Sequence, residues 1–302
     1  MRNTKKFEVD LATALSAHDT HEPAEMTLNE LLRAYDARHC KAELMRLKKW
    51  TNALGTYSAW AITTEQLSTC AQALKSAGYS PASPNRDLSA LGTIYKWAIS
   101  ERLAPRGFKS PTTGVTRFKE RIRRVFATSE EIKALRDGSL GFQDRRFGVF
   151  VNLVLDTGAR KGEIYARRWG DVDLQKREIM LETTKNGDPR TLHFSDETLA
   201  LMLRVFPNRP SDRLIFEGRV PGQPVNYRAA WHKLRTQVGR ADVRLHDSRH
   251  FVSARMLRNG FPLAVAAQAI GNSPAVLAAR YGHLETRALH QAISSTWTDQ
   301  NL

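Results

Sequence analysis

A stretch of prolines, glycines and basic residues interrupts the helical patterning of the chain about a third of the way along it. Between Pro105 and Phe126 the sequence holds two prolines, two glycines and seven lysines and arginines. Proline and glycine break helices, so this composition predicts an inter-domain linker over residues 105–126. The linker divides the 302 residues into two parts, each long enough for its own core, since domains commonly run to roughly 100–200 residues.

The part before the linker predicts a small helical domain. Residues 1–25 mix charges without sustained periodicity and are expected to form a lead-in, whereas residues 26–104 repeat apolar side chains at helical spacing. Four helices are predicted, beginning near Thr27, at Ala42, at Thr63 and at Pro84. Basic side chains on these helices, such as Arg46 and Lys48, form either a solvated face or a face turned to a polyanion.

The part after the linker, residues 127–302, predicts a mainly α domain with a small β-sheet. Thr128 with Glu131 three residues on is a helix-capping pattern, and a further helix is expected from Lys161 to Trp169. Residues 178–182 and 191–194 favour two strands joined by a tight turn at residues 185–188, because Asn-Gly tolerates positive φ. From residue 195 onward the patterns are helical.

The charge of the chain points to a polyanionic partner. The net charge is +15, and each phosphate that a lysine or arginine neutralises releases counterions, so nucleic acid is the leading partner and a merely basic soluble protein is the alternative. Cys40 and Cys70 are too few for a disulfide framework. With no apolar run of membrane-spanning length, we expect a cytoplasmic, nucleoid-associated protein without a membrane partner.

Five side chains of the second domain supply the means to cut a phosphodiester. Its negative charge repels nucleophiles, so cleavage needs cations on the non-bridging oxygens and an acid for the leaving oxygen. Arginine binds phosphate bidentately, and a tyrosine becomes a nucleophile only where its phenolate is stabilised. The five residues are Arg160, Lys185, His246, Arg249 and Tyr281. Each of them alone fits a salt bridge or a packing role better, but together they favour catalysis.

Patterns for other chemistries are missing from the sequence. There is no Cys-x-x-Cys or His-Glu-x-x-His pair with metal-ligand spacing, and no Gly-x-x-x-x-Gly-Lys-Ser/Thr phosphate loop. We therefore expect a reaction that uses neither a metal nor ATP as cofactor.

In combination these motifs resemble those of the tyrosine recombinases, the phage integrase and Xer class of site-specific DNA recombinases. The family's Thr-Gly-x-Arg-x-x-Glu motif is matched by Thr157, Gly158, Arg160 and Glu163, and its hairpin lysine by Lys185. The His-x-x-Arg motif is matched by His246 and Arg249, and Tyr-x-His by Tyr281 and His283. The resemblance covers nearly the whole chain.

The resemblance implies a mechanism. Tyr281 would attack the scissile phosphate and form a 3′-phosphotyrosine, Arg160 and Arg249 would stabilise the pentacoordinate phosphorane, and Lys185 would protonate the leaving 5′-oxygen. His246 would assist proton transfer at the nucleophile, and Glu163 would orient Arg160 or His246 or else be a surface glutamate. His250 and His283 are expected to pack around the site.

The resemblance also implies an architecture and partners. A SAM-like core-binding domain and a catalytic domain would form a two-domain clamp on double-stranded DNA with an inverted-repeat core site. The protein would act as a homodimer on each site and a homotetramer at synapsis, would belong to a mobile genetic element, and would have accessory DNA-bending or directionality factors as possible further partners. The apolar face of residues 289–297 is expected to dock on a neighbouring protomer, with folding back on its own domain as the alternative.

The chain departs from the family pattern at two positions. Asn272 stands where the family usually has histidine or tryptophan, and Ala278 where it often has threonine. Asn272 still offers a hydrogen-bond donor to a phosphate oxygen but lacks the charge and bulk of an imidazole, so we expect weaker transition-state support without loss of function.

Two other functions fit parts of this pattern. A non-catalytic DNA-binding protein derived from a recombinase would explain Asn272, and a type IB topoisomerase would share the chemistry while relaxing single duplexes. Covalent adduct formation tests the first, and relaxation of a plasmid that lacks a recombination site tests the second.

Overall fold

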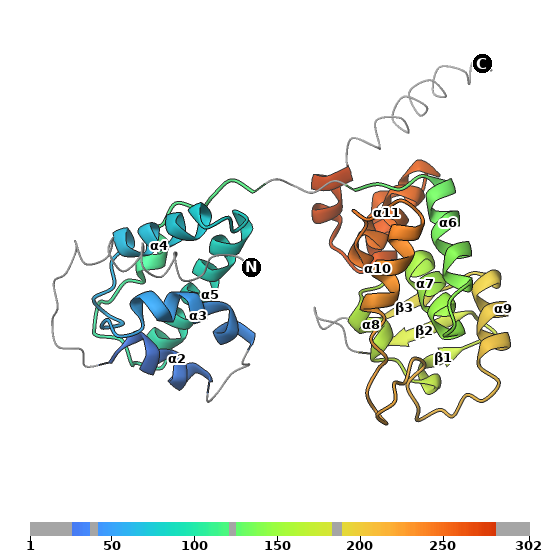
Figure 1. The fold of residues 1–302 in the computed structure, drawn as a ribbon, viewed down its shortest axis with the longest axis horizontal. Helices are drawn as coiled ribbons and strands as arrows, with labels where there is room; N and C mark the ends of the chain where they lie inside the picture. The colour runs from blue at the N-terminus through green and yellow to red at the C-terminus, as the bar shows by residue number, and fades with distance from the viewer. Residues whose placement is uncertain (1–25, 37–41, 121–124, 183–188, 282–302) are drawn as a thin grey trace, which may run out of the picture. The chain divides into compact units, whose positions relative to one another are not determined.

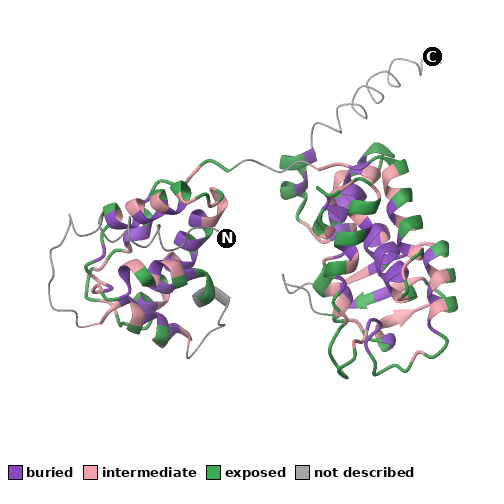
Figure 2. Ribbon diagram, viewed as in Figure 1, coloured by how far each residue is buried: buried purple, intermediate pink, exposed green. Residues whose placement is uncertain are grey.

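The computed structural model describes residues 26–36, 42–120, 125–182 and 189–281, and it divides into two compact units. The first unit is Met1–Ile122 and the second is Arg123–Leu302 (Figure 1). Each unit has its own buried core (Figure 2). Lys185 lies outside the described residues, as does the segment 289–297.

The first unit is helical, as the sequence predicted. Its elements are α2 (Leu28–Asp36), α3 (Ala42–Leu54), α4 (Thr64–Ser76), α5 (Ala82–Ser100) and the 3₁₀ turn η1 (Pro111–Thr113). The capping pattern at Thr27 is confirmed: the Glu30 N–H donates to Thr27 Oγ1 at 3.2 Å, and the Glu30 carboxylate accepts from the Thr27 N–H at 2.7 Å. Thr63 caps α4 in the same way with Gln66.

The core of the first unit includes one buried ionic contact. Asp87 on α5 is 1% exposed, and its carboxylate accepts from Trp50 Nε1 at 3.0 Å and pairs with Lys49 Nζ at 2.6 Å. A buried charge is tolerated where it is paired and hydrogen-bonded, so this contact fixes α3 against α5.

The second unit is built around one helix. Its helical elements are α6 (Ser129–Leu140), α7 (Arg145–Thr157), α8 (Lys161–Tyr165), η2 (Trp169–Asp171), α9 (Asp196–Val205), α10 (Arg228–Gln237), η3 (Leu245–Asp247), α11 (Ser248–Arg258) and α12 (Leu263–Ile270). Residues 147–155 of α7 are all buried, and α7 contacts α6, α9, α11 and the sheet. A helix that is apolar on every side belongs inside a core.

A three-stranded antiparallel sheet packs on this core. It has the order β1 (Val172–Asp173), β2 (Glu178–Leu181), β3 (Arg190–His193), with Ile179 paired to Val172 and to Leu192. The two predicted strands are confirmed, and β1 was not predicted because two residues are too short for a period to show. On β2 the side chains of Ile179 and Leu181 are buried while Met180 is 56% exposed, as strand alternation requires.

Two predicted helical stretches are shorter than expected. The helix that begins at Lys161 ends at Tyr165, and the chain then forms a β-bridge from Arg168 to Leu214. Residues 206–227 contain no helix between α9 and α10, because the segment from Pro207 to Pro224 holds four prolines and two glycines, which end helical patterning. None of the described helices is long and apolar enough to cross a membrane.

Gly158 ends α7 in the left-handed conformation, with φ 59° and ψ 20°. A Cβ there would lie 3.1 Å from Ile270 Cγ2 and 3.3 Å from the Arg249 Cα. We expect Gly158→Ala to lower the free energy of unfolding by at least about 1–2 kcal/mol, since an L-residue is strained at positive φ even without crowding. Urea titration measures the change.

Gly162 is the matched control for this substitution. It lies in the helix α8, and a Cβ there would meet no atom within 4 Å. Gly162→Ala should leave stability unchanged or raise it by up to about 1 kcal/mol. Equal destabilisation by both substitutions would contradict the assignment of strain to Gly158.

Candidate active site

The buried guanidinium of Arg249 is the centre of the site. Arg249 lies in the first turn of α11 and is 3% exposed. Its Nη1 donates to the Gly158 carbonyl at 2.9 Å, and its Nη2 donates to the Ile270 carbonyl and to Asn272 Oδ1, the latter at 3.2 Å. Burial lowers the pKa of Arg249 to about 10, helped by the nearby charge of Arg160, so the group still carries its charge at neutral pH.

Two helix ends supply the carbonyls that hold this cation. Both α7 and α12 end at a glycine in the left-handed conformation, Gly158 with φ 59° and Gly271 with φ 64°. The carbonyl end of a helix carries partial negative charge, and a left-handed glycine turns the chain away so that the last carbonyls stay open. A cation is therefore favoured at the point where α7 and α12 both end.

Arg160 and Glu163 form a pair at the start of α8. The Arg160 N–H and Nη1 donate to the two Glu163 carboxylate oxygens, each at 2.7 Å, and Arg160 Nη2 lies 3.5 Å from the Gly271 carbonyl. Burial alone would raise the pKa of Glu163, but hydrogen bonds from Arg160 and the charge of Arg190 hold it below the usual 4.5. Glu163 is therefore ionised at neutral pH and orients Arg160.

Arg190 is a residue of the site that the sequence reasoning missed. It is the first residue of β3, its Nη2 donates to Glu163 Oε2 at 2.7 Å, and its Nη1 donates to the Ala269 carbonyl at 2.8 Å. The side chains of both partners in the ion pair are about one-tenth exposed, at 11% and 10%. The signal in the sequence was its position, two residues after the predicted turn at residues 185–188.

Tyr281 lies on a separate helix, over residues 274–281, that Ser273 caps through its Oγ, which accepts the Val276 N–H at 3.3 Å. The tyrosine is 3% exposed and packs against Phe126, with ring centroids 6.3 Å apart. Burial raises the pKa of Tyr281 to about 12, although the charge of Arg280 opposes the rise. The phenol is therefore protonated at neutral pH.

The phenol of Tyr281 is hydrogen-bonded to His250, the residue after Arg249 on α11. The other ring nitrogen of His250, Nε2, is 3.2 Å from Arg280 Nη1. Burial lowers the pKa of His250, and the positive charge of Arg280 adds to this, so the imidazole is neutral at pH 7. The sequence predicted that His250 packs in or behind the site, and the structure places it in contact with the Tyr281 phenol.

His246 lies in η3 and is exposed. Its ring centroid is 6.4 Å from that of His250. Burial of part of the ring, together with the positive charge of Arg249, lowers the pKa of His246, which leaves it neutral and able to accept a proton at pH 7.

The structure thus brings together most of the predicted residues in two linked groups. Arg160, Glu163, Arg249 and Asn272 meet at the ends of α7 and α12, while Tyr281 contacts α11 through His250. In the described part of the chain, no group of three or more His, Cys, Asp or Glu side chains is placed to hold a metal ion. Three guanidiniums around one carboxylate leave a net positive site, which favours a phosphate.

Comparisons with known proteins agree with this chemistry. Residues 119–287, more than half of the chain, match the sequence model of the phage integrase family, and residues 26–102 match that of the phage integrase N-terminal SAM-like domain. The chain is similar to the tyrosine recombinase XerA of Saccharolobus solfataricus, with 27% identity over 45% of each chain. It is also similar to the tyrosine recombinase XerC of Xanthomonas campestris, with 24% identity over 88% of this chain and 84% of the relative.

The matches differ in how much of each relative they span. The chain spans about half the length of two curated relatives, 45% of XerA and 57% of a putative integrase/recombinase of Haemophilus influenzae to which it is 26% identical over 58% of its own length. Among solved structures, the fold is similar to that of the lambda integrase tetramer bound to a Holliday junction, with a TM-score of 0.63 and 15% identity over 88% of this chain and 84% of that one.

Removal of the Glu163 charge should reveal a pH-dependent contribution to stability. The pKa of Glu163 is lower in the folded protein than in the unfolded protein, where it is near 4.5. The carboxylate therefore stabilises the fold fully at pH values above the unfolded pKa, and this stabilisation is lost as the pH falls through the folded pKa. Glu163→Gln should cost about 3 kcal/mol at pH 7, since it leaves buried guanidiniums without their partner. Urea titrations of both proteins from neutral to acidic pH should show the difference shrinking with acid.

Glu197, an exposed residue in the first turn of α9, provides the control. Glu197→Gln removes the same charge from a solvated position and should cost no more than about 1 kcal/mol. A pH-independent difference for Glu163→Gln would mean that the carboxylate charge is not what stabilises this cluster.

Proposed function

The chain belongs to the phage integrase family, and we propose that it is a site-specific DNA recombinase that cuts DNA with Tyr281 as the nucleophile. This assignment rests on the contacts that two consecutive residues of α11 make. Arg249 holds the ends of α7 and α12 at the arginine cluster, and the next residue, His250, holds the Tyr281 phenol. One helix thus joins the cationic group to the nucleophile.

The proposed cleavage exchanges one phosphate ester for another. The Tyr281 oxygen attacks the scissile phosphorus, the bond from phosphorus to the 5′-oxygen breaks, and a 3′-phosphotyrosine and a 5′-hydroxyl result. Because the number of ester bonds is unchanged, the strand is rejoined when a 5′-hydroxyl attacks the phosphotyrosine, and no ATP is consumed. Lys185 supplies the proton to the leaving 5′-oxygen in this proposal.

The cations act on the charge that builds up at phosphorus. Arg160 and Arg249 donate to the non-bridging oxygens, and a planar guanidinium suits this because it offers two parallel N–H groups. Glu163 and Arg190 act through Arg160, which they position. Asn272 accepts from Arg249 through Oδ1, which leaves its amide N–H groups for a phosphate oxygen.

The phenolic proton needs an acceptor as the phenolate forms. His250 contacts the phenol through Nδ1 and is neutral at pH 7, so we assign Nδ1 the first acceptance of this proton, in the tautomer that carries the ring hydrogen on Nε2. His246, which is neutral and exposed, assists the transfer onward or binds the phosphate. These roles combine the family motif with the contact that the structure places at Tyr281.

The substrate and assembly follow from the family. We propose that the protein acts at the nucleoid on double-stranded DNA with an inverted-repeat core site, as a dimer on each site and a tetramer at synapsis. The tetrameric state of lambda integrase on a Holliday junction supports this, as does the net charge of +15. Accessory DNA-bending or directionality factors and the contact made by residues 289–297 belong to the same proposal.

Tyr281→Phe should abolish covalent attachment to DNA while leaving DNA affinity unchanged, because it removes only the phenolic oxygen. DNA trapped on the protein in host cells under denaturing conditions, then sequenced, measures attachment and reveals the site; gel-shift titration measures affinity. Phe118→Leu, a substitution in the other unit, controls for expression. Strand exchange by Tyr281→Phe would rule out this nucleophile, and absence of adducts in wild type would favour the binding-only alternative.

Asn272→Ala should slow cleavage about 100-fold, the usual effect of removing one donor that stabilises transition-state charge. Asn272→His should cleave at least as fast as wild type, since an imidazole restores a donor with charge and bulk. Single-turnover cleavage of the recovered site measures both rates. A cleavage rate unaffected by Asn272→Ala would remove Asn272 from the catalytic group without affecting the assignment of Tyr281.

A further inference from the structure

Arg280, the residue before Tyr281, contacts the same histidine that contacts the nucleophile. Its Nη1 donates to His250 Nε2 at 3.2 Å, while Nδ1 of the same ring is hydrogen-bonded to the Tyr281 phenol. His250 lies in the first turn of α11, and the other two residues lie at the end of the helix over residues 274–281. The Arg280 guanidinium is therefore linked to the phenolic oxygen through the imidazole.

A guanidinium can only donate hydrogen bonds, and this fixes the roles of the two ring nitrogens. A neutral imidazole has one nitrogen that carries a hydrogen and one that accepts. Because Arg280 donates to Nε2, Nε2 is the acceptor and the ring hydrogen is on Nδ1. Nδ1 then donates to the Tyr281 oxygen. In this tautomer His250 has no lone pair on Nδ1 with which to take the phenolic proton.

The contact requires a neutral His250, and the surroundings of the ring keep it neutral. Burial lowers the pKa of His250, and the positive charge of Arg280 lowers it further. His246 and Arg249 act in the same direction, whereas Asp247 opposes them. The imidazole is thus uncharged at pH 7 and has two tautomers, of which the contact with Arg280 favours one.

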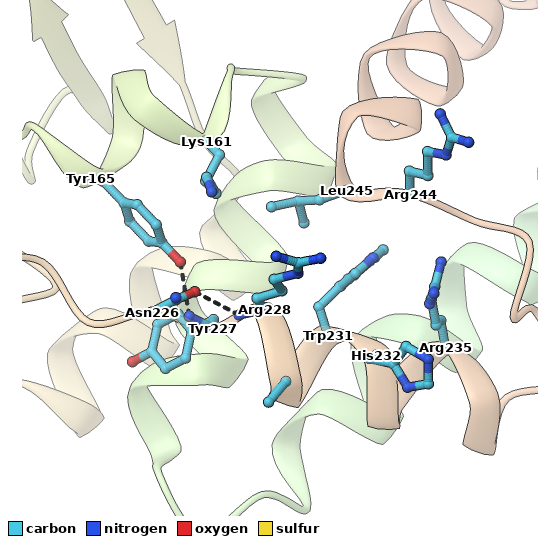
Figure 3. A pocket seen from close by; sticks show the side chains of 11 residues that line it. Lys161, Tyr165, Asn226, Tyr227, Arg228, Trp231, His232, Arg235, Arg244 and Leu245 are labelled. Carbon is cyan, nitrogen blue, oxygen red and sulfur yellow. Dashed lines mark hydrogen bonds between the residues drawn. The ribbon is translucent and has the colours of Figure 1, made fainter. Parts of the chain in front are cut away.

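Arg228 is an exposed arginine of the same unit that lacks such a contact. It lines a groove of about 780 Å³ between α8 and α10, together with Tyr165, Trp231 and Arg244 (Figure 3). Its backbone N–H donates to Asn226 Oδ1 at 3.0 Å, but its guanidinium has no hydrogen bond or ion pair with another described residue. Arg228 therefore matches Arg280 in charge and exposure without contacting an imidazole.

We propose that Arg280 is a positioning residue that holds His250 in the tautomer unable to accept the Tyr281 proton, so that cleavage begins only after Arg280 has left Nε2. The inference rests on the proposed function, because it concerns the first proton transfer of the same cleavage. Once Nε2 is released, water takes the hydrogen from Nδ1 and supplies one to Nε2. Nδ1 then accepts the phenolic proton, and the Tyr281 oxygen keeps the electron pair with which it attacks phosphorus.

The charge of Arg280 and its hydrogen bond act differently on this transfer. The charge lowers the pKa of both Tyr281 and His250, the donor and the acceptor of the proton, so its effects on the transfer largely cancel. The hydrogen bond favours one tautomer only, and nothing offsets it. Removal of the Arg280 side chain should therefore speed the transfer, although it also removes a cation beside the nucleophile.

The tautomer can be measured in the free protein, without DNA. Nitrogen-15 NMR of the full chain labelled at histidine separates ring nitrogens that carry a hydrogen from those that do not, and His250→Gln identifies the signals of this ring. The wild type should carry the hydrogen on Nδ1 at pH 7, and Arg280→Met should move it largely to Nε2. A hydrogen on Nε2 in the wild type, or the same tautomer in both proteins, would overturn the proposal.

The rate of adduct formation tests what the tautomer does. On the DNA site recovered by trapping, at saturating DNA, Arg280→Met should form the Tyr281 adduct about 10-fold faster in a single turnover, because a hydrogen bond from a charged donor no longer has to break. Arg228→Met removes an equally exposed charge and should neither change the tautomer nor raise the rate. An unchanged or lower rate in Arg280→Met, or an equal gain in Arg228→Met, would contradict the role of Arg280.

Failure of the proposed function gives a different pattern of results. If Tyr281 is not the nucleophile, no variant forms a Tyr281-dependent adduct, while Arg280→Met still changes the tautomer of His250. If Arg280 does not set the tautomer, Tyr281-dependent adducts form and Arg280→Met leaves the NMR signals of the His250 ring in the wild-type pattern. A changed tautomer together with faster adduct formation is the expected pair of results.

Discussion

The architecture of the second unit depends on one buried charge. Arg249 is 3% exposed, and a guanidinium at such a position must satisfy its N–H groups within the protein. It does so with the carbonyls of Gly158 and Ile270, which lie at the ends of two different helices. The guanidinium to which we assign phosphate binding therefore also holds α7, α11 and α12 together, so the fold of this unit and the proposed chemistry depend on the same residue.

Much of the fold could be predicted because local signals and burial agree in this chain. The capping residues Thr27, Thr63 and Thr128 mark true helix starts, and the two predicted strands do pair, with Ile179 opposite Leu192, whereas the predicted turn at residues 185–188 lies outside the described residues. The predicted helix through Trp169 was too long, because the bridge from Arg168 to Leu214 is a tertiary contact that no local pattern contains.

The candidate site was predictable only in part. Motif spacing suggested Arg160, Glu163 and Arg249, which the structure does bring together. Arg190 and the role of His250 were not visible, since one depends on how β3 lies beside α12 and the other on where the Tyr281 helix packs. Sequence patterns report which side chains a segment carries, and the contacts between distant segments appear only once they are folded.

The contact between Gly271 and Arg190 has a consequence for how this chain can vary. A Cβ at position 271 would lie 2.7 Å from Arg190 Nε, and the φ of 64° independently disfavours any side chain. A homologue that has lost the arginine is thus still held to glycine at this position by the backbone. Glycine at position 271 does not in turn require arginine at position 190. Sequence variation at this pair of positions can therefore begin only with replacement of the arginine.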